Sequence, residues 1–296
     1  ADADMRTYDR IDVIPSSAKT ALAGVYTLWN SGPAWQMASL NDSSLIEQRI
    51  APIMNHISTV YCARNADHTQ WVMDWLCNAV KRPEQPTRAA LAFIGREGSC
   101  KNILFDWYME NIIGLRNVFQ TADPETTLFA KFSDACFGKL MVVLDEAKNL
   151  NRFEEQLKNL ITSKTLTMER KYVSGLIKFT NTVNVLITSN NEFPVRITGT
   201  CRRYTTFKCS DELCGNADYF TNLSKHLQQR ETIQAFISNA RSRDLEAIYG
   251  YSFERSRPIT DFNRAAKYAS ISTLHRFLSA LVHEIEAAQA DAEASN

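Results

Sequence analysis

The sequence has little of what marks disulfide-rich, fibrous or membrane proteins. Its 296 residues include only 10 glycines, 8 prolines and 7 cysteines, and 33 basic side chains balance 33 acidic ones. Purely apolar runs are short, as at 140–144, whereas a membrane-spanning helix needs roughly 20 apolar residues. The hydrophobic share of 45% excludes intrinsic disorder, and the composition is typical of a globular protein with one large or two small domains.

Cysteine spacing and charge set further limits. The cysteines are scattered and never spaced Cys-x-x-Cys, which argues against both a disulfide framework and a zinc site. The segment Ala1-Asp2-Ala3-Asp4 is not a basic flank followed by an apolar stretch, so no secretory signal is predicted. We therefore expect a reducing, intracellular compartment and no membrane partner. Because the net charge is zero, nucleic-acid binding would need a local basic patch.

The chain divides into three segments by its apolar pattern. Residues 1–85 have apolar side chains three and four apart, which predicts a helical N-terminal region that ends near Pro83 and Pro86. Residues 86–210 form a predicted core of a different kind. Helical spacing returns in the C-terminal region, 211–296.

The core segment has the pattern of an α/β fold. Three short apolar runs, at 90–94, 140–144 and 183–188, suit strands that are covered on both faces. A helix is predicted at 102–108, between the first two runs. The order strand, helix, strand predicts a parallel sheet with crossover helices.

A phosphate-binding loop is predicted directly after the first run, at Gly95-Arg96-Glu97-Gly98-Ser99-Cys100-Lys101-Asn102. The pattern G-x-x-x-x-G-K-[ST] is matched at Gly95 and Lys101, while Cys100 replaces the second glycine and Asn102 the hydroxyl residue. Such a loop points backbone N–H groups at phosphates, and its lysine adds a point charge. Asn102 offers an amide oxygen to Mg²⁺. A glycine-rich turn of this kind is also often only a tight connection.

An acidic pair, Asp145 and Glu146, ends the second apolar run. The carboxyl ends of parallel strands are where ligands bind, so one carboxylate could hold Mg²⁺ and the other could polarise an attacking water. The alternative is that the pair only caps a following helix.

The third run ends in Ser189-Asn190-Asn191, which brings a polar amide, Asn190, to the same edge of the sheet. Arg202 and Arg203 follow and could stabilise transition-state charge. Taken singly, these features have simpler explanations, because Asn-Asn is common in turns and an arginine pair is usually solvated. Their occurrence in one order makes coincidence less probable.

These motifs resemble those of superfamily 3 helicases, which are AAA+-type P-loop ATPases of viruses and mobile elements, and especially the primase-helicase branch. Residues 93–102 resemble the Walker A motif, 139–147 resemble Walker B, and Ser189-Asn190-Asn191-Glu192 resembles the sensor. Arg202-Arg203-Tyr204 resembles the arginine-finger segment. The resemblance covers most of the chain and departs from the family at Cys100.

The resemblance implies an ATP- and Mg²⁺-dependent helicase or translocase for single-stranded or forked DNA in replication. The expected assembly is a hexameric ring with ATP bound between subunits, and a primase domain could lie upstream. A viral protein would act in the host cytoplasm or nucleus. The implied nucleotide-binding residues are Gly95, Glu97, Gly98, Ser99, Cys100, Lys101 and Asn102. The implied catalytic residues are Lys101, Asp145, Glu146, Asn190, Arg202 and Arg203, and the implied metal ligands are Asn102 and Asp145.

A basic hairpin is predicted between the acidic pair and the asparagine. Its basic side chains lie in a stretch rich in Thr, Val and Ile, as in an exposed strand pair. The resemblance places these basic side chains in the central channel of the ring. Tyr172 could stack on a base while the cations contact phosphates. Lysines that only solubilise an exposed strand pair are an equally good explanation for any one residue. The predicted nucleic-acid contacts are Lys164, Arg170, Lys171, Tyr172 and Lys178.

Two other functions remain open. Because Cys100 departs from the motif, the chain could be an ATPase-impaired scaffold that binds nucleic acid or forms rings. It could also be another AAA+ DNA motor, for packaging or remodelling. The tryptophans of the first segment are predicted to be core residues, and the five isolated histidines are not predicted to be catalytic or metal-binding.

Overall fold

The computed structural model describes residues 10–15, 25–27, 29, 31–99, 101–131, 133–147, 150–169, 175–191, 194–195, 202–250, 253–269 and 281–282. Four residues with a predicted role, Cys100, Arg170, Lys171 and Tyr172, lie outside the described residues. So does most of the helix predicted at 272–288.

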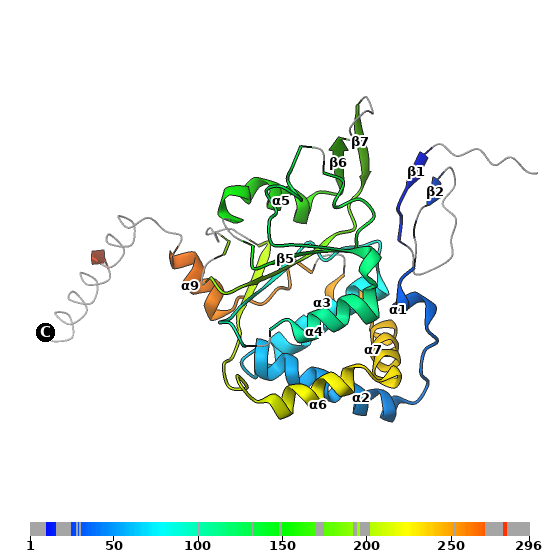
Figure 1. The fold of residues 1–296 in the computed structure, drawn as a ribbon, viewed down its shortest axis with the longest axis vertical. Helices are drawn as coiled ribbons and strands as arrows, with labels where there is room; N and C mark the ends of the chain where they lie inside the picture. Colours follow the sequence, from blue (N-terminus) through cyan, green and yellow to red (C-terminus); the bar gives the residue numbers. More distant parts are fainter. Residues whose placement is uncertain are drawn as a thin grey trace, which may run out of the picture.

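A five-stranded, fully parallel sheet forms the centre of the fold (Figure 1). Its order is β4-β5-β8-β3-β9. An antiparallel hairpin, β6-β7, is separate from it, so the fold is α/β and mostly parallel, as predicted. The strands of the sheet are β3 (Ala90–Ile94), β4 (Val118–Thr121), β5 (Met141–Asp145), β8 (Asn184–Ser189) and β9 (Tyr204–Lys208).

The central strands are apolar at every position because both faces of the sheet are covered. In β3, Leu91 and Phe93 belong to one hydrophobic cluster, and Ala90 and Ala92 belong to a second. Successive side chains point to opposite faces of a strand, so two cores require an unbroken apolar run. This is the physical reason that the runs predicted the strands correctly.

Helices from both ends of the chain cover the first face, below the sheet in Figure 1. Helices α2 and α3 both pack against α7. The helical elements before β4, among the described residues, are α1 (Pro33–Gln36), α2 (Ser43–His56), the π-helical turn η1 (Ile57–Tyr61), α3 (Ala66–Lys81), α4 (Ile103–Tyr108), the π-helical turn η2 (Met109–Ile113) and the 3-10 turn η3 (Leu115–Asn117). After β9 come α6 (Ala217–Leu227), α7 (Arg230–Ser242) and α8 (Leu245–Tyr249), and then α9 (Asp261–Ala269), whose Ala266 belongs to the core of the second face.

The second face is covered by α5 and the hairpin, above the sheet in Figure 1. Here η4 (Leu150–Phe153) leads into α5 (Glu154–Thr162), and β6 (Thr165–Glu169) pairs with β7 (Leu176–Thr180). Leu166, Met168 and Phe179 are the inward-facing hairpin residues of this core. The hairpin predicted from the sequence is thus present.

Local signals explain the long helices of the first segment. Asp42 caps α2 by accepting a hydrogen bond from the backbone N–H of Leu45, and Asn65 caps α3 in the same way. Trp71 and Trp75, both on α3, are 3% and 1% exposed, so their predicted core role is confirmed. No helix among the described residues is long and apolar enough to cross a membrane.

Two parts of the fold differ from the prediction. The N-terminal region is not wholly helical, because β1 (Arg10–Asp12) and β2 (Val25–Thr27) form a small parallel sheet of their own. Strand β4 was not predicted either. It is four residues long and lies at the edge of the sheet with only Val118 fully buried, so it lacks the apolar run that marks a central strand. The division of the chain into three domains remains a prediction.

Candidate phosphate-binding site

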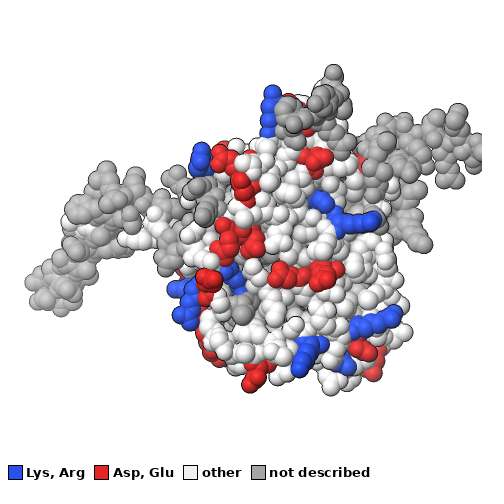
Figure 2. Space-filling model, viewed as in Figure 1, with Lys and Arg blue, Asp and Glu red and all other residues white. Residues whose placement is uncertain are grey.

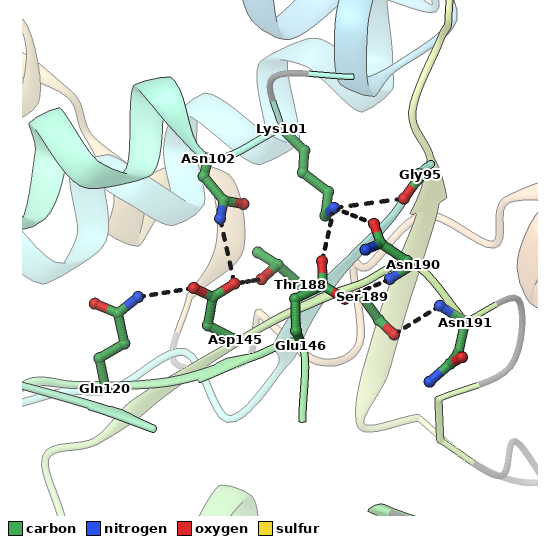
Figure 3. A network of polar contacts seen from close by, with 10 residues as sticks. All are labelled: Gly95, Lys101, Asn102, Gln120, Asp145, Glu146, Thr188, Ser189, Asn190 and Asn191. Carbon is green, nitrogen blue, oxygen red and sulfur yellow. Dashed lines mark hydrogen bonds and ion pairs between the residues drawn. The ribbon is translucent and has the colours of Figure 1, made fainter. Parts of the chain in front are cut away.

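Three predicted motifs meet at one edge of the sheet. The loop follows β3, the acidic pair ends β5, and Asn190 follows β8, and these strands are neighbours in the order β5-β8-β3. Because the strands are parallel, all three carboxyl ends reach the same edge. Figure 3 shows the side chains pointing toward one another.

Lys101 lies at the centre of this group. Its Nζ is 2.8 Å from Glu146 Oε1, and it donates to Asn190 Oδ1 at 2.6 Å and to the Gly95 carbonyl at 3.4 Å (Figure 3). The lysine side chain is 7% exposed. An ammonium group has three hydrogens, so these three acceptors saturate it. A phosphate oxygen that binds Lys101 must therefore replace one of them.

Glu146 links the lysine to the asparagine. Its Oε2 accepts a hydrogen bond from the backbone N–H of Asn190 at 2.9 Å, while Oε1 pairs with Lys101. The residue has φ of +52°, in the left-handed region that non-glycine residues seldom adopt. Strain of this kind costs about 1–3 kcal/mol and is concentrated at functional sites. The backbone therefore turns directly after β5 and aims this carboxylate at the loop.

Asp145 forms a second polar group beside the first. Its Oδ1 accepts from Asn102 Nδ2 at 3.2 Å and from the Thr188 hydroxyl, and its Oδ2 accepts from Gln120 Nε2 at 3.0 Å. The structure thus brings together Asn102 and Asp145, the two predicted metal ligands. Thr188 and Gln120 were not predicted as site residues. Their signal was weak, since each is a single polar residue next to the last position of its strand.

Asn102 and Asp145 offer oxygen atoms of the kind that Mg²⁺ prefers, and Asn102 presents its Nδ2, not its oxygen, to Asp145. Asn102 Oδ1 is buried and has no hydrogen-bond partner among the described residues. Within that same part of the chain, no group of three or more His, Cys, Asp or Glu side chains could hold a metal. Mg²⁺ does not need such a cage, because it usually binds one or two protein oxygens together with phosphates and water.

Ser99 is a buried polar residue of the loop. The Ser99 side chain is 2% exposed, and its Oγ has no partner among the described residues. A Cβ added to Gly95 would lie 2.8 Å from this Oγ and 2.9 Å from Cys209 Cβ, so only glycine fits there. Gly98 has φ of +80°, which also favours glycine. Gly98 and Glu97 are exposed at the tip of the loop.

A third acidic residue, Asp106, was missed by the sequence analysis. It lies on α4 four residues after Asn102 and therefore on the same face of the helix. Burial raises the pKa of its carboxyl group, and the charge of Asp145 raises it further. The negative potential at this edge of the sheet is therefore stronger than the predicted acidic pair alone would produce.

The arginine pair does not join this group within one chain. Arg202 and Arg203 precede β9, and Tyr204 pairs with Ala90 at the start of β3. The Ala90 N–H donates to the Arg203 carbonyl at 2.7 Å. The pair thus lies at the amino edge of the sheet, opposite the loop. Arg202 is exposed, whereas Arg203 is half-buried.

The predicted nucleic-acid residues that the structure describes are both exposed. Lys164 precedes β6, and Lys178 lies on β7 opposite Thr167. On the face shown in Figure 2, the described acidic and basic side chains are interspersed, without a broad basic field. Contact with phosphates on this face would therefore depend on a few local cations.

Comparison with known proteins finds similarity to a family of unknown function and to one phage protein. Residues 93–203 match a family of unknown function (DUF5906), and this range contains the loop, the acidic pair, Asn190 and the arginine pair. The chain is also 28% identical, over 150 residues, to the DNA primase-polymerase of Nitratiruptor phage NrS-1. That alignment covers 48% of this chain but only 20% of the phage protein.

Solved structures of the NrS-1 C-terminal region have a similar fold. One apo structure superposes with a TM-score of 0.67 at 18% identity, covering 90% of this chain and 62% of that one. An A-form apo structure gives a TM-score of 0.68 at 17% identity, with the same coverage. At these identities the likeness shows the fold alone, and the chain spans less than two thirds of the region that it matches.

Proposed function

We propose that the chain is the ATP-hydrolysing motor segment of a DNA replication protein, a helicase or translocase. The observation that carries this proposal is the convergence of Lys101, Glu146 and Asn190 at the carboxyl ends of three adjacent parallel strands. A cation, a carboxylate and an amide joined in this way match the needs of phosphoryl transfer, in which positioning and charge stabilisation dominate.

Each residue has a role that follows from its position. Lys101 exchanges one of its protein acceptors for a phosphate oxygen, which releases Glu146 to accept a proton from an attacking water. Asn190 then orients that water or the terminal phosphate. Asn102 and Asp145 would hold Mg²⁺, and the bound ion would supply positive charge to neutralise the charge that develops on the phosphates.

DNA replication is proposed from the similarity to a phage DNA primase-polymerase. The exposed lysines of the hairpin supply a contact for single-stranded or forked DNA. A hexameric ring would bring the arginine pair of one subunit to the loop of the next. A neutral chain suits such an assembly because only the surface that faces DNA needs to be basic.

The test is ATP hydrolysis by purified protein with Mg²⁺ and single-stranded DNA. We expect activity that DNA stimulates. Glu146→Gln should lower kcat by about 10²–10⁴-fold, the usual worth of a general base, and Lys101→Ala should abolish ATP binding. Glu155→Gln on α5 is a matched control because this exposed carboxylate pairs with Lys158 on the same helix.

A scaffold function is the second candidate, since protein acceptors already occupy every hydrogen of Lys101. Retained DNA binding with neither ATP binding nor hydrolysis would favour the scaffold and contradict the motor. Cys100→Gly separates the two further. It should raise ATP hydrolysis strongly if the cysteine impairs the loop.

A further inference from the structure

A buried tyrosine from the N-terminal helices contacts the loop from behind. Tyr61, in the π-helical turn η1, is 1% exposed, and its hydroxyl donates to the Lys101 carbonyl at 2.8 Å. Its ring centroid is 4.6 Å from that of Phe93 on β3 and 5.2 Å from that of Phe105 on α4. Tyr61 therefore packs against the strand before the loop and the helix after it.

A histidine contacts the hydroxyl of Tyr61 from the side opposite the loop. His56 is fully buried at the end of α2, with Nε2 3.3 Å from the Tyr61 oxygen and Nδ1 3.2 Å from the Tyr219 oxygen. Burial lowers the pKa of His56 to about 4, so the ring is neutral and has one N–H. Because the Tyr61 proton is given to the Lys101 carbonyl, Nε2 must be the donor to Tyr61. Nδ1 then accepts from Tyr219.

The geometry of the peptide bond connects these hydrogen bonds to the side of the loop that would face a bound phosphate. A trans peptide is planar, and its carbonyl and N–H point in opposite directions. The Lys101 carbonyl points into the buried tyrosine, so the N–H of Asn102 in the same peptide unit points away from it. A buried hydroxyl thus determines where a backbone donor of the phosphate-binding loop is aimed.

We infer that Tyr61, oriented by His56, is a positioning residue that fixes the Lys101–Asn102 peptide so that the Asn102 N–H faces the terminal phosphates of a nucleoside triphosphate. The inference rests on the proposed function. One donor aimed at a phosphate binds substrate and transition state alike, so its loss raises KM more than it lowers kcat.

The test is Tyr61→Phe, with Tyr108→Phe as the matched control. Tyr108 is also fully buried, and its hydroxyl donates to the Leu76 carbonyl at 2.7 Å, away from the loop. For Tyr61→Phe we expect KM for ATP, and Kd for a non-hydrolysable ATP analogue, to rise about fivefold, the worth of one hydrogen bond, while kcat stays within about twofold. Tyr108→Phe should leave both constants unchanged.

A second measurement does not depend on activity. Amide hydrogen exchange of the loop peptide, in protein without nucleotide, should be faster in Tyr61→Phe and unchanged in Tyr108→Phe. His56→Leu should also make exchange of the loop peptide faster. His56→Gln keeps an N–H donor, so exchange should be slower in this variant than in His56→Leu. If Tyr61→Phe behaves like Tyr108→Phe in exchange and affinity, the inference is overturned. If the unaltered protein binds no nucleotide, the proposed function fails, and the exchange comparison still decides whether Tyr61 fixes the loop.

Discussion

At the scale of single residues, His56 shows how burial changes the chemistry of a side chain that the sequence presents as isolated. Its two ring nitrogens lie within hydrogen-bonding distance of tyrosine hydroxyls, and it has no solvent contact. The prediction that this histidine is neither catalytic nor a metal ligand stays a prediction, but its place in a chain of hydrogen bonds to the loop was not foreseen.

The titration of His56 predicts a loss of stability in mild acid. The pKa is 6.5 when the residue is solvated and about 4 in the fold, so the unfolded state takes up the proton first as the pH falls. The stability that the neutral His56 contributes is therefore fully present above the unfolded-state pKa, and it is lost as the pH falls from that pKa to the folded-state pKa. From about pH 7.5 to about pH 5 we expect the free energy of unfolding to fall by about 2 kcal/mol through this residue.

Urea denaturation at the two pH values measures this loss. His56→Gln is the comparison because it cannot titrate, and its unfolding free energy should fall less over the same interval. Equal losses in the two proteins would show that other groups cause the pH dependence.

At the scale of elements, the β6-β7 hairpin is the part of the fold that most directly tests DNA contact. One side of the hairpin is anchored in the core through Leu166 and Phe179, which leaves Lys178 exposed on β7. The element is therefore held in place by packing, and its exposed lysines are available for phosphates.

We expect Lys164→Ala and Lys178→Ala each to weaken binding of single-stranded DNA. Each lost phosphate contact should also reduce the salt dependence, the slope of log K against log salt, by about 0.7. Fluorescence anisotropy over a series of salt concentrations measures both quantities. Lys158→Ala, an exposed lysine on α5, is the control. If the hairpin variants have the same affinity and the same slope as this control, the hairpin is not part of the DNA interface.

At the scale of the whole molecule, the two edges of the sheet carry opposite halves of the predicted catalytic set. Lys101 and Glu146 lie at the carboxyl edge and the arginine pair lies at the amino edge. A single chain therefore cannot complete the set, whereas a head-to-tail contact between copies places one edge against the other.

Mixing two inactive variants tests this arrangement. Lys101→Ala removes the loop cation, and the double variant Arg202→Ala, Arg203→Ala removes the arginines. If the arginines act on the neighbouring subunit, a mixture regains ATP hydrolysis, because some interfaces join an intact loop to an intact arginine pair. A mixture that is as inactive as its two components would exclude a role for the arginines between subunits.

Much of the candidate site could be predicted because it depends on short-range patterns and one general rule. Apolar runs at 90–94 and 140–144 mark strands buried on both faces, and parallel strands place their carboxyl ends together. Glu146 and Asn190 come within two residues of the runs at 140–144 and 183–188, and Lys101 ends the glycine-containing loop that follows the run at 90–94, so their meeting could be predicted from motif and strand order. Gln120 was missed because its own strand, β4, is short and at the edge of the sheet.

The sequence by itself determined the parallel sheet, the loop and the polar residues that end its strands, because periodicity and strand ends are local properties of the chain. Only the tertiary structure decided that Lys101 is saturated by protein acceptors, that the arginine pair lies at the far edge and that Tyr61 holds the loop from behind. Those facts depend on strand order and on the packing of helices distant in sequence. No local sequence pattern encodes strand order or helix packing, because both depend on which surfaces of distant segments bury one another.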